Sequence, residues 1–199
     1  MDLLTSDYEL FDRSMFTFKQ LKERYTTEEL AQLKVRYQTH WQKWKKMNEQ
    51  VAKATPLQWQ MRKPKIESWT NGWNLRSHFW CAYRSEGRQQ ENACLATLLN
   101  KKQFQIYLMF QHYRSEDRQG SISSFNHLLT VLKEWSKHIP VEEYYIWPQP
   151  EHELVDHLPL ATYLTDKQKQ IELKKAMEHK TFQLGKLYFY PNELKDAEK

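Results

Sequence analysis

Apolar side chains recur every three or four residues between Leu30 and Val51, the spacing that places them on one face of an α-helix. The preceding Thr26-Thr27-Glu28-Glu29 fits a capping box, in which a threonine hydroxyl and the third-position carboxylate satisfy backbone donors reciprocally. Pro56 cannot continue a helix, so it marks the end. The pattern predicts one long amphipathic helix with this apolar stripe: Leu30, Leu33, Tyr37, Trp41, Trp44, Met47 and Val51.

The middle of the chain has the pattern of β-strands. Apolar residues cluster within residues 75–84, which predicts a strand that is covered on both faces. Two further apolar runs, residues 93–99 and 103–113, flank the short polar segment Asn100-Lys101-Lys102. Two such runs joined by a short polar turn predict a β-hairpin.

The C-terminal part mixes helical and strand patterns. Helical spacing follows Ser121 and Ser123, either of which can cap the helix that Pro140 stops. The pattern of residues 144–147 predicts a short strand. Residues 165–168 fit a second capping box, which predicts a helix that extends to about residue 180. A final strand is predicted over residues 184–190.

This order of elements predicts a single α+β domain over residues 1–199, with a mainly antiparallel sheet. It contains a long N-terminal basic amphipathic helix and two further helices. The expected parts are a helical region (1–65), a β-hairpin block (66–113) and a mixed helix and strand region (114–199).

Composition excludes several protein classes. The 199 residues include 8 Trp but only 4 Gly and 2 Cys, which argues against collagen-like, disordered and disulfide-stapled chains. No apolar run approaches the roughly 20 residues that span a bilayer, and residues 1–7 lack the pattern of a signal peptide. We therefore expect a cytoplasmic protein with reduced Cys81 and Cys94, and no membrane partner.

The net charge of +5 is concentrated in one window. Residues 34–65 hold nine basic side chains and one acid, Glu49, which gives this window a net charge of +8, whereas residues 101–199 are balanced. Local basicity favours an anionic partner, and nucleic acid is the first candidate. The expected phosphate contacts are Lys43, Lys45, Lys46, Arg62, Lys63 and Lys65.

Trp41 and Trp44 lie among these lysines, and an exposed indole can stack on an unpaired base. Their place on the apolar stripe favours the alternative, in which both are buried and the lysines form a solvated face.

A second candidate site is a pocket for a planar anionic ligand. Aromatic and guanidinium groups suit such a ligand, and four of the residues are expected on one strand face. The alternative is a core face that is covered by a helix. The candidate lining is Trp69, Trp73, Arg76, His78, Trp80 and Arg84.

Fewer residues in the sequence support a metal site or a reactive thiol. His152 and Asp156 echo the H-E-x-x-H zinc motif around Glu153, but with Asp at the second ligand position and with prolines nearby. A charged loop is the simpler interpretation, and we expect no metal or cofactor.

Two stretches, Leu10–Phe18 and Trp69–Arg84, resemble a small family of uncharacterised bacterial proteins. Some members of that family are labelled glucose-6-phosphate dehydrogenase. The present chain is too short for that two-domain enzyme and has no glycine-rich βα turn for a dinucleotide. No catalytic residue can therefore be transferred from the label.

The sequence thus predicts a non-catalytic binding protein for an anionic partner such as nucleic acid. The alternatives are a small enzyme or ligand-binding protein that uses the Trp/Arg/His-lined pocket, and a subunit, such as that of a homodimer, whose aromatic surface is a protein interface.

Overall fold

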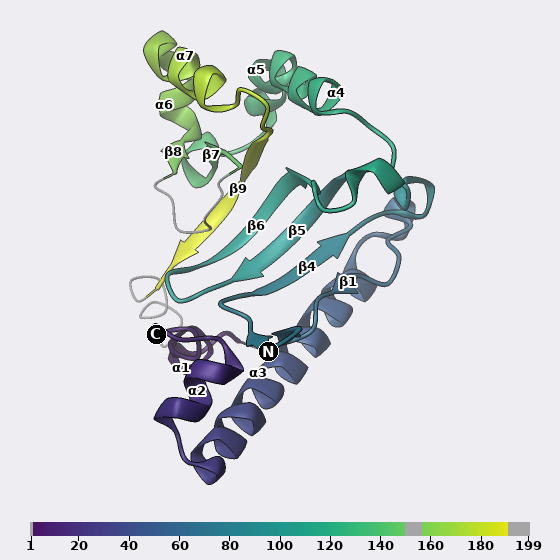
Figure 1. Cartoon of the computed structure of the whole chain (residues 1–199). Coiled ribbons are helices and arrows are strands. Elements are labelled where there is room, and N and C mark those ends of the chain that lie inside the picture. Colours follow the sequence, from purple (N-terminus) through teal and green to yellow (C-terminus); the bar gives the residue numbers. More distant parts are fainter. Residues whose placement is uncertain (1, 150–156, 191–199) are drawn as a thin grey trace, which may run out of the picture. The chain divides into compact units, whose positions relative to one another are not determined.

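The computed structural model describes residues 2–149 and 157–190 (Figure 1). Helix α3 (Thr27–Ala54) is its longest element, as the apolar spacing predicted. The Thr26 hydroxyl accepts a hydrogen bond from Glu29 N at 3.2 Å, and the Glu29 carboxylate accepts one from Thr26 N at 2.8 Å. This confirms the first capping box.

The inward face of α3 differs from the expected stripe at one end. Leu30, Tyr37 and Trp44 are buried, and Asn48 and Ala52 continue the buried row. The expectation for Val51 was wrong, because this side chain is 49% exposed.

The remaining helices and strands are shorter than α3. The N-terminal helices are α1 (Thr5–Glu9) and α2 (Phe18–Arg24), and the later ones are α4 (Ile122–Asn126), α5 (Leu132–Trp135), α6 (Leu160–Thr165) and α7 (Lys167–Ala176). The strands are β1 (Lys65–Ile66), β2 (Thr70–Asn71), β3 (Asn74–Leu75), β4 (Phe79–Tyr83), β5 (Ala93–Leu99), β6 (Gln103–Phe110), β7 (Tyr145–Pro148), β8 (Leu158–Pro159) and β9 (Phe182–Phe189).

Seven strands form one sheet in the order β1-β4-β5-β6-β9-β7-β8, and β2 pairs with β3. The β1–β4, β7–β8 and β7–β9 pairs are antiparallel. The α+β class with a large antiparallel sheet and a long N-terminal helix is therefore confirmed.

The chain divides into two compact units. The described residues of unit 1 fall in Met1–Ser85, Thr97–Phe104 and Tyr188–Lys199, and those of unit 2 fall in Glu86–Ala96 and Gln105–Leu187.

The core of unit 1 is aromatic and lies between α3, the N-terminal helices and β4. The ring of Phe79 packs edge-on against Phe11 at 5.0 Å and against Tyr37 at 6.4 Å between ring centroids. Trp44 contacts the same ring at 6.3 Å. Packing of the N-terminal helices on this core fixes the orientation of α3, and with it the face that its lysines present.

A buried polar network continues this core. Asn48 Oδ1 accepts hydrogen bonds from the hydroxyls of Tyr83 at 2.5 Å and Thr97 at 2.7 Å, while Asn48 Nδ2 donates to Trp44 O at 2.8 Å. Because a buried polar group must find partners, this network explains why an amide occupies the inward face of α3.

In unit 2 the ring of Phe125, from α4, lies 4.9 Å from the ring of Phe182 and 5.7 Å from that of Phe110. Ser121, one of the two expected caps, accepts a hydrogen bond from Ser124 N at the start of α4. The expectation of one helix up to Pro140 was wrong, because 3₁₀ turns at His127–Thr130 and Ser136–His138 interrupt this segment. The second predicted capping box was wrong by one residue: Asp166 caps α7, while Thr165 ends α6.

We expect Gly185→Ala to destabilise the protein. Gly185 lies in β9, and a methyl group there would lie 2.1 Å from Ile106 O and 2.5 Å from Tyr107 Cβ. Backbone atoms cannot move aside as a side-chain end can, so the strands must shift, at a cost of about 2–3 kcal/mol in chemical denaturation. Gly87→Ala is the control, because nothing lies within 4 Å of its added methyl group. Equal effects at the two glycines would contradict this prediction.

Candidate anion-binding surface

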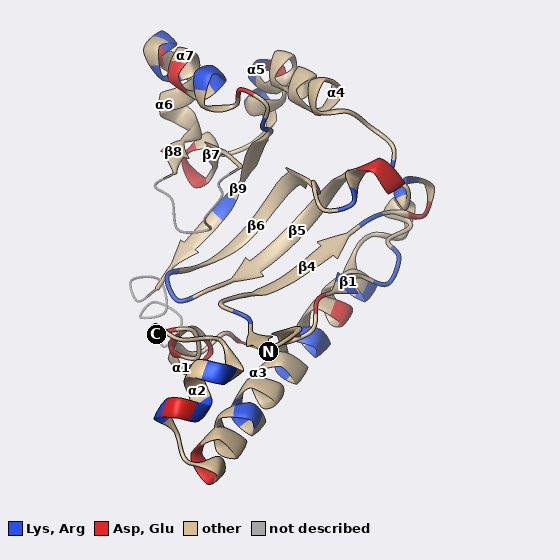
Figure 2. Ribbon diagram, in the orientation of Figure 1, with Lys and Arg blue, Asp and Glu red and all other residues tan. Residues whose placement is uncertain are grey.

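The exposed or partly exposed cations around the C-terminal half of α3 form what we call the basic surface: Lys45, Lys46, Lys53, Arg62, Lys63 and Lys65. Figure 2 shows how Lys and Arg recur along α3 and near β1. Lys53 was not among the expected contacts, although it belongs to the same basic window. It lies in the last turn of α3, where a cation is favoured by the helix dipole.

The turn after α3 brings residues 61–65 back beside the helix. α3 ends before Pro56, and Leu57–Trp59 form a single 3₁₀ turn. Gln60 then adopts a left-handed conformation with φ of 46°. Beyond it, Arg62 N donates to Arg84 O at 3.2 Å, and β1 pairs with β4. The sheet therefore fixes the path of this segment.

A surface pocket of about 340 Å³ lies between this segment and α3. It brings Lys53, Arg62 and Lys63 together, which confirms only their proximity and leaves their function a prediction. The sole acid of the basic window, Glu49, also lines the pocket, and its carboxylate lies 3.7 Å from Lys63 Nζ. The full lining is Glu49, Ala52, Lys53, Met61, Arg62, Lys63 and Pro64.

Lys43 stands apart from the basic surface. Its ammonium group forms an ion pair with Asp7, which is only 3% exposed. Asp7 also bonds to His40 Nδ1 at 2.6 Å and accepts from Leu4 N at 2.8 Å. The charge of Lys43 is thus matched inside the protein, and this ion pair links α1 to α3.

The Asp7 carboxylate is held in its charged form. Burial raises its pKa, but the hydrogen bond from Leu4 N and the contacts with Lys43 and His40 outweigh burial and lower the pKa below its usual value.

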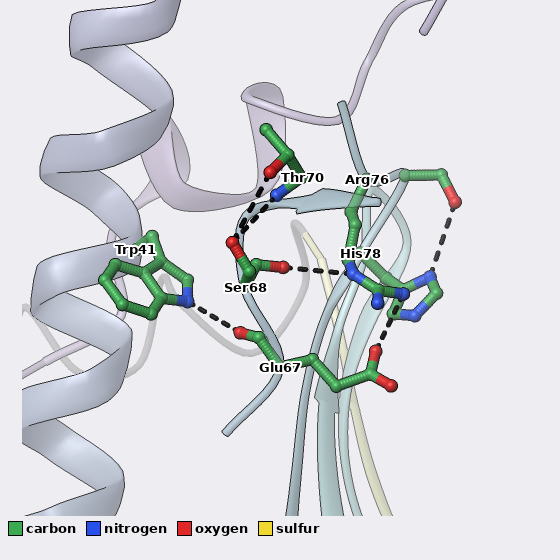
Figure 3. Close-up of polar contacts among 7 residues, drawn as sticks. Trp41, Glu67, Ser68, Thr70, Arg76 and His78 are labelled. Carbon is green, nitrogen blue, oxygen red and sulfur yellow. Dashed lines mark hydrogen bonds and ion pairs between the residues drawn. The ribbon is translucent and has the colours of Figure 1, made fainter. Parts of the chain in front are cut away.

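The two tryptophans of the apolar stripe are not arranged to stack on a base. Trp44 is 1% exposed in the aromatic core. Trp41 is half-buried, and its indole Nε1 donates to Glu67 O at 2.7 Å (Figure 3). Lys45 Nζ lies 5.5 Å from the centre of the Trp41 ring. These contacts support the alternative in which both side chains serve packing.

Sequence analysis missed Trp59. This side chain is 52% exposed and lies in the turn just after α3, beside Leu57, which is 93% exposed. The available signal was its position after Pro56, outside the periodic apolar stripe of the helix. An exposed indole three residues before Arg62 is a better candidate for stacking than Trp41 or Trp44.

The second candidate pocket is dispersed in the structure. Arg76 lies between β3 and β4, so the expectation that it shares a strand face with Trp80 was wrong. Its Nη1 lies 2.7 Å from the Glu67 carboxylate, and its Nε donates to Ser68 O at 3.0 Å (Figure 3). The guanidinium group is therefore already matched by an internal anion.

The other members of that pocket have different environments. Trp80 is buried, whereas Trp73 is 85% exposed at the tip of the β2–β3 turn. His78 precedes β4, Arg84 follows it, and Trp69 is half-buried. Ligand binding by these residues stays a prediction.

The metal candidates His152 and Asp156 lie outside the described residues. Within residues 2–149 and 157–190, no group of three or more His, Cys, Asp or Glu side chains is placed to hold a metal ion. Cys81 and Cys94 are both buried, and they are not joined in a disulfide. None of the helices in the described part of the chain combines the length and apolar character that a membrane crossing requires.

Comparison with known proteins places this chain in a family. A protein-family model matches residues 3–199. The chain belongs to this family. Its members are uncharacterised proteins, which confirms the resemblance seen in the sequence. One relative, described as an uncharacterised protein of Haemophilus influenzae, is 30% identical over 160 residues, which cover 78% of this chain and 72% of the relative.

Proposed function

We propose that the protein binds a polyanion, with nucleic acid as the first candidate, through the basic surface. The observation that carries this proposal is the convergence of Lys53, Arg62 and Lys63 on one surface pocket. Cations that neutralise phosphates release condensed counterions, which supplies most of the affinity of non-specific nucleic-acid binding.

Charge matching inside the protein supports the choice of this surface. Lys43 and Arg76 are held by the carboxylates of Asp7 and Glu67. By contrast, the side chain of Lys63 is 79% exposed, and Lys46, Lys53 and Lys65 are also exposed. The Lys63–Glu49 ion pair is long, at 3.7 Å, and its lysine is exposed. Such a pair contributes little stability, so a phosphate can compete for the lysine.

Non-catalytic binding is the conclusion that these residues support best. Nucleic acid as the partner also fits the cytoplasmic location that the sequence predicts, which we retain as part of the proposal.

Lysine footprinting tests where the partner binds. We expect a DNA or RNA strand to slow acetylation of Lys46, Lys53 and Lys63 in the folded protein. The exposed lysines Lys133 and Lys174 of unit 2 are the internal controls and should react at an unchanged rate. The proposal would be contradicted if only the control lysines were protected, or if no lysine were protected.

A further inference from the structure

The pocket beside α3 differs in chemistry between its interior and its rim. We propose that the basic surface takes single-stranded in preference to double-stranded nucleic acid, with one unpaired base in this pocket and a neighbouring base stacked on Trp59. This inference rests on the proposed function and adds the form of nucleic acid that is recognised.

The interior of the pocket suits a base. Ala52 and Pro64 are buried and Met61 is half-buried, so the pocket has apolar walls. Its volume of about 340 Å³ lies at the lower end of the range for small-molecule sites, which is the size class of a planar heterocycle.

Glu49 argues against a phosphate inside the pocket. Its carboxylate would repel a phosphate group that entered, because like charges at short range raise the free energy. The same carboxylate can accept a hydrogen bond from the exocyclic amino group of a base. The cations Lys53, Arg62 and Lys63 line the same pocket and are exposed, so phosphates can be bound at the rim.

Trp59 provides a stacking surface on a fixed turn. Trp59 N donates to Pro56 O at 3.0 Å, and Gln60 N donates to Leu57 O at 3.0 Å. The bond from Arg62 N to Arg84 O then ties the end of this turn to the residue that directly follows β4. Little conformational freedom of the backbone therefore remains to be lost when a base stacks on the indole.

A duplex cannot use either feature. Its bases are stacked on one another, and a base must leave the stack before a pocket or an aromatic ring can contact its face. A single strand presents these faces without that cost, which is why aromatic platforms beside basic grooves are typical of single-strand binding.

A lipid surface is the main competing partner, because Leu57 and Trp59 are exposed and lie between Lys53 and Lys63 in the sequence. A helix that lies on a membrane inserts an apolar face between the lipids. In α3 that face is already buried, with Tyr37 and Trp44 in the core of unit 1. The two side chains of the turn alone offer a bilayer little apolar area, so the charge and pocket favour nucleic acid.

The test compares three probes at equal salt: a mixed-sequence DNA strand of about 15 nucleotides, its duplex, and heparin, a polyanion without bases. The wild-type protein should bind the strand more tightly than the duplex. Trp59→Ala should weaken strand binding by about 5- to 150-fold, the range for loss of one base–aromatic stack, and leave heparin binding unchanged. Trp59→Phe should restore most of the loss.

Tyr113→Ala is the control, because it removes a highly exposed aromatic side chain of unit 2 that belongs to neither candidate site, and it should leave strand binding unchanged. Equal affinity of the wild-type protein for strand and duplex would overturn the inference. So would a Trp59→Ala variant whose binding to heparin is weakened as much as its binding to the strand. Neither result would contradict polyanion binding itself. Vesicles of phosphatidylserine and phosphatidylcholine are a separate, fourth probe. Vesicle binding that requires Trp59, with strand binding unaffected by Trp59→Ala, would overturn the inference in favour of a lipid surface. Failure of all three probes to bind would instead refute the proposed function itself.

Discussion

Replacing Asp7 with alanine should lower the free energy of unfolding by about 3 kcal/mol, the lower end of the range for breaking a buried ion pair. The side chain is 3% exposed, and its carboxylate contacts Lys43, His40 and Leu4 N. Without it, two polar groups of α3 and one backbone donor lose their partner. The lower end applies because Lys43 and His40 are 24% and 16% exposed, so water can reach them in part.

The effect should depend on pH. Because folding lowers the pKa of Asp7, its contribution is present above the pKa of the unfolded chain, near 4, and is lost as the pH falls through the folded value. The difference between wild type and Asp7→Ala should therefore shrink from about pH 7 to about pH 3 in urea denaturation.

Asp12→Ala is the control for this prediction. Asp12 is 76% exposed and lies 3.6 Å from Lys101, so its loss should cost less than about 1 kcal/mol. A difference between wild type and Asp7→Ala that stays constant with pH would show that the charge of Asp7 does not stabilise the fold.

Reversing three charges of the basic surface should strongly weaken polyanion binding. In the variant Lys46→Glu, Lys53→Glu, Lys63→Glu, the loss of about three phosphate contacts should weaken strand binding about 100-fold at about 0.1 M salt. Fluorescence anisotropy with a labelled strand measures this change. All three side chains are exposed, so the melting temperature should change little.

A second triple variant separates this effect from net charge. Lys133→Glu, Lys174→Glu, Lys175→Glu makes the same change in total charge at exposed positions of unit 2. Its affinity should remain close to that of the wild type. If both variants lose affinity equally, the anion is attracted by the overall charge and the basic surface is not a specific site.

Local signals in the sequence were sufficient to predict where several elements begin and end. The capping box at Thr26 and the break at Pro56 depend on neighbouring residues alone, and they gave the correct ends of α3 to within a residue or two. In the same way, Asn100 Oδ1 accepts from Lys102 N and Gln103 N, which explains the tight polar turn expected between residues 99 and 103.

The choice of buried face could not be read from hydrophobicity. In β6, Ile106 is 41% exposed, whereas Gln105 is 3% exposed. On α3, Asn48 is buried because Tyr83 and Thr97 donate to it, and both lie far away in the sequence. Such partners are set by tertiary packing, so a periodic pattern cannot reveal them.

For the same reason, only part of the candidate site could be predicted from the sequence. The excess of cations in residues 34–65 can be counted directly in the sequence. The ion pair between Lys43 and Asp7 cannot be predicted in this way, because the two residues are 36 positions apart. Trp59 has no periodic signal, and only the path of the turn after α3 shows that it is exposed.

The salt dependence of wild-type binding tests the central claim most directly. If about four lysines of the basic surface contact phosphates, the logarithm of the binding constant should fall with the logarithm of salt concentration with a slope of about −3. Between about 50 and 200 mM salt, affinity for a labelled DNA strand should therefore fall roughly 50- to 70-fold. No binding at the lowest salt, or binding that does not change across this range, would contradict the account.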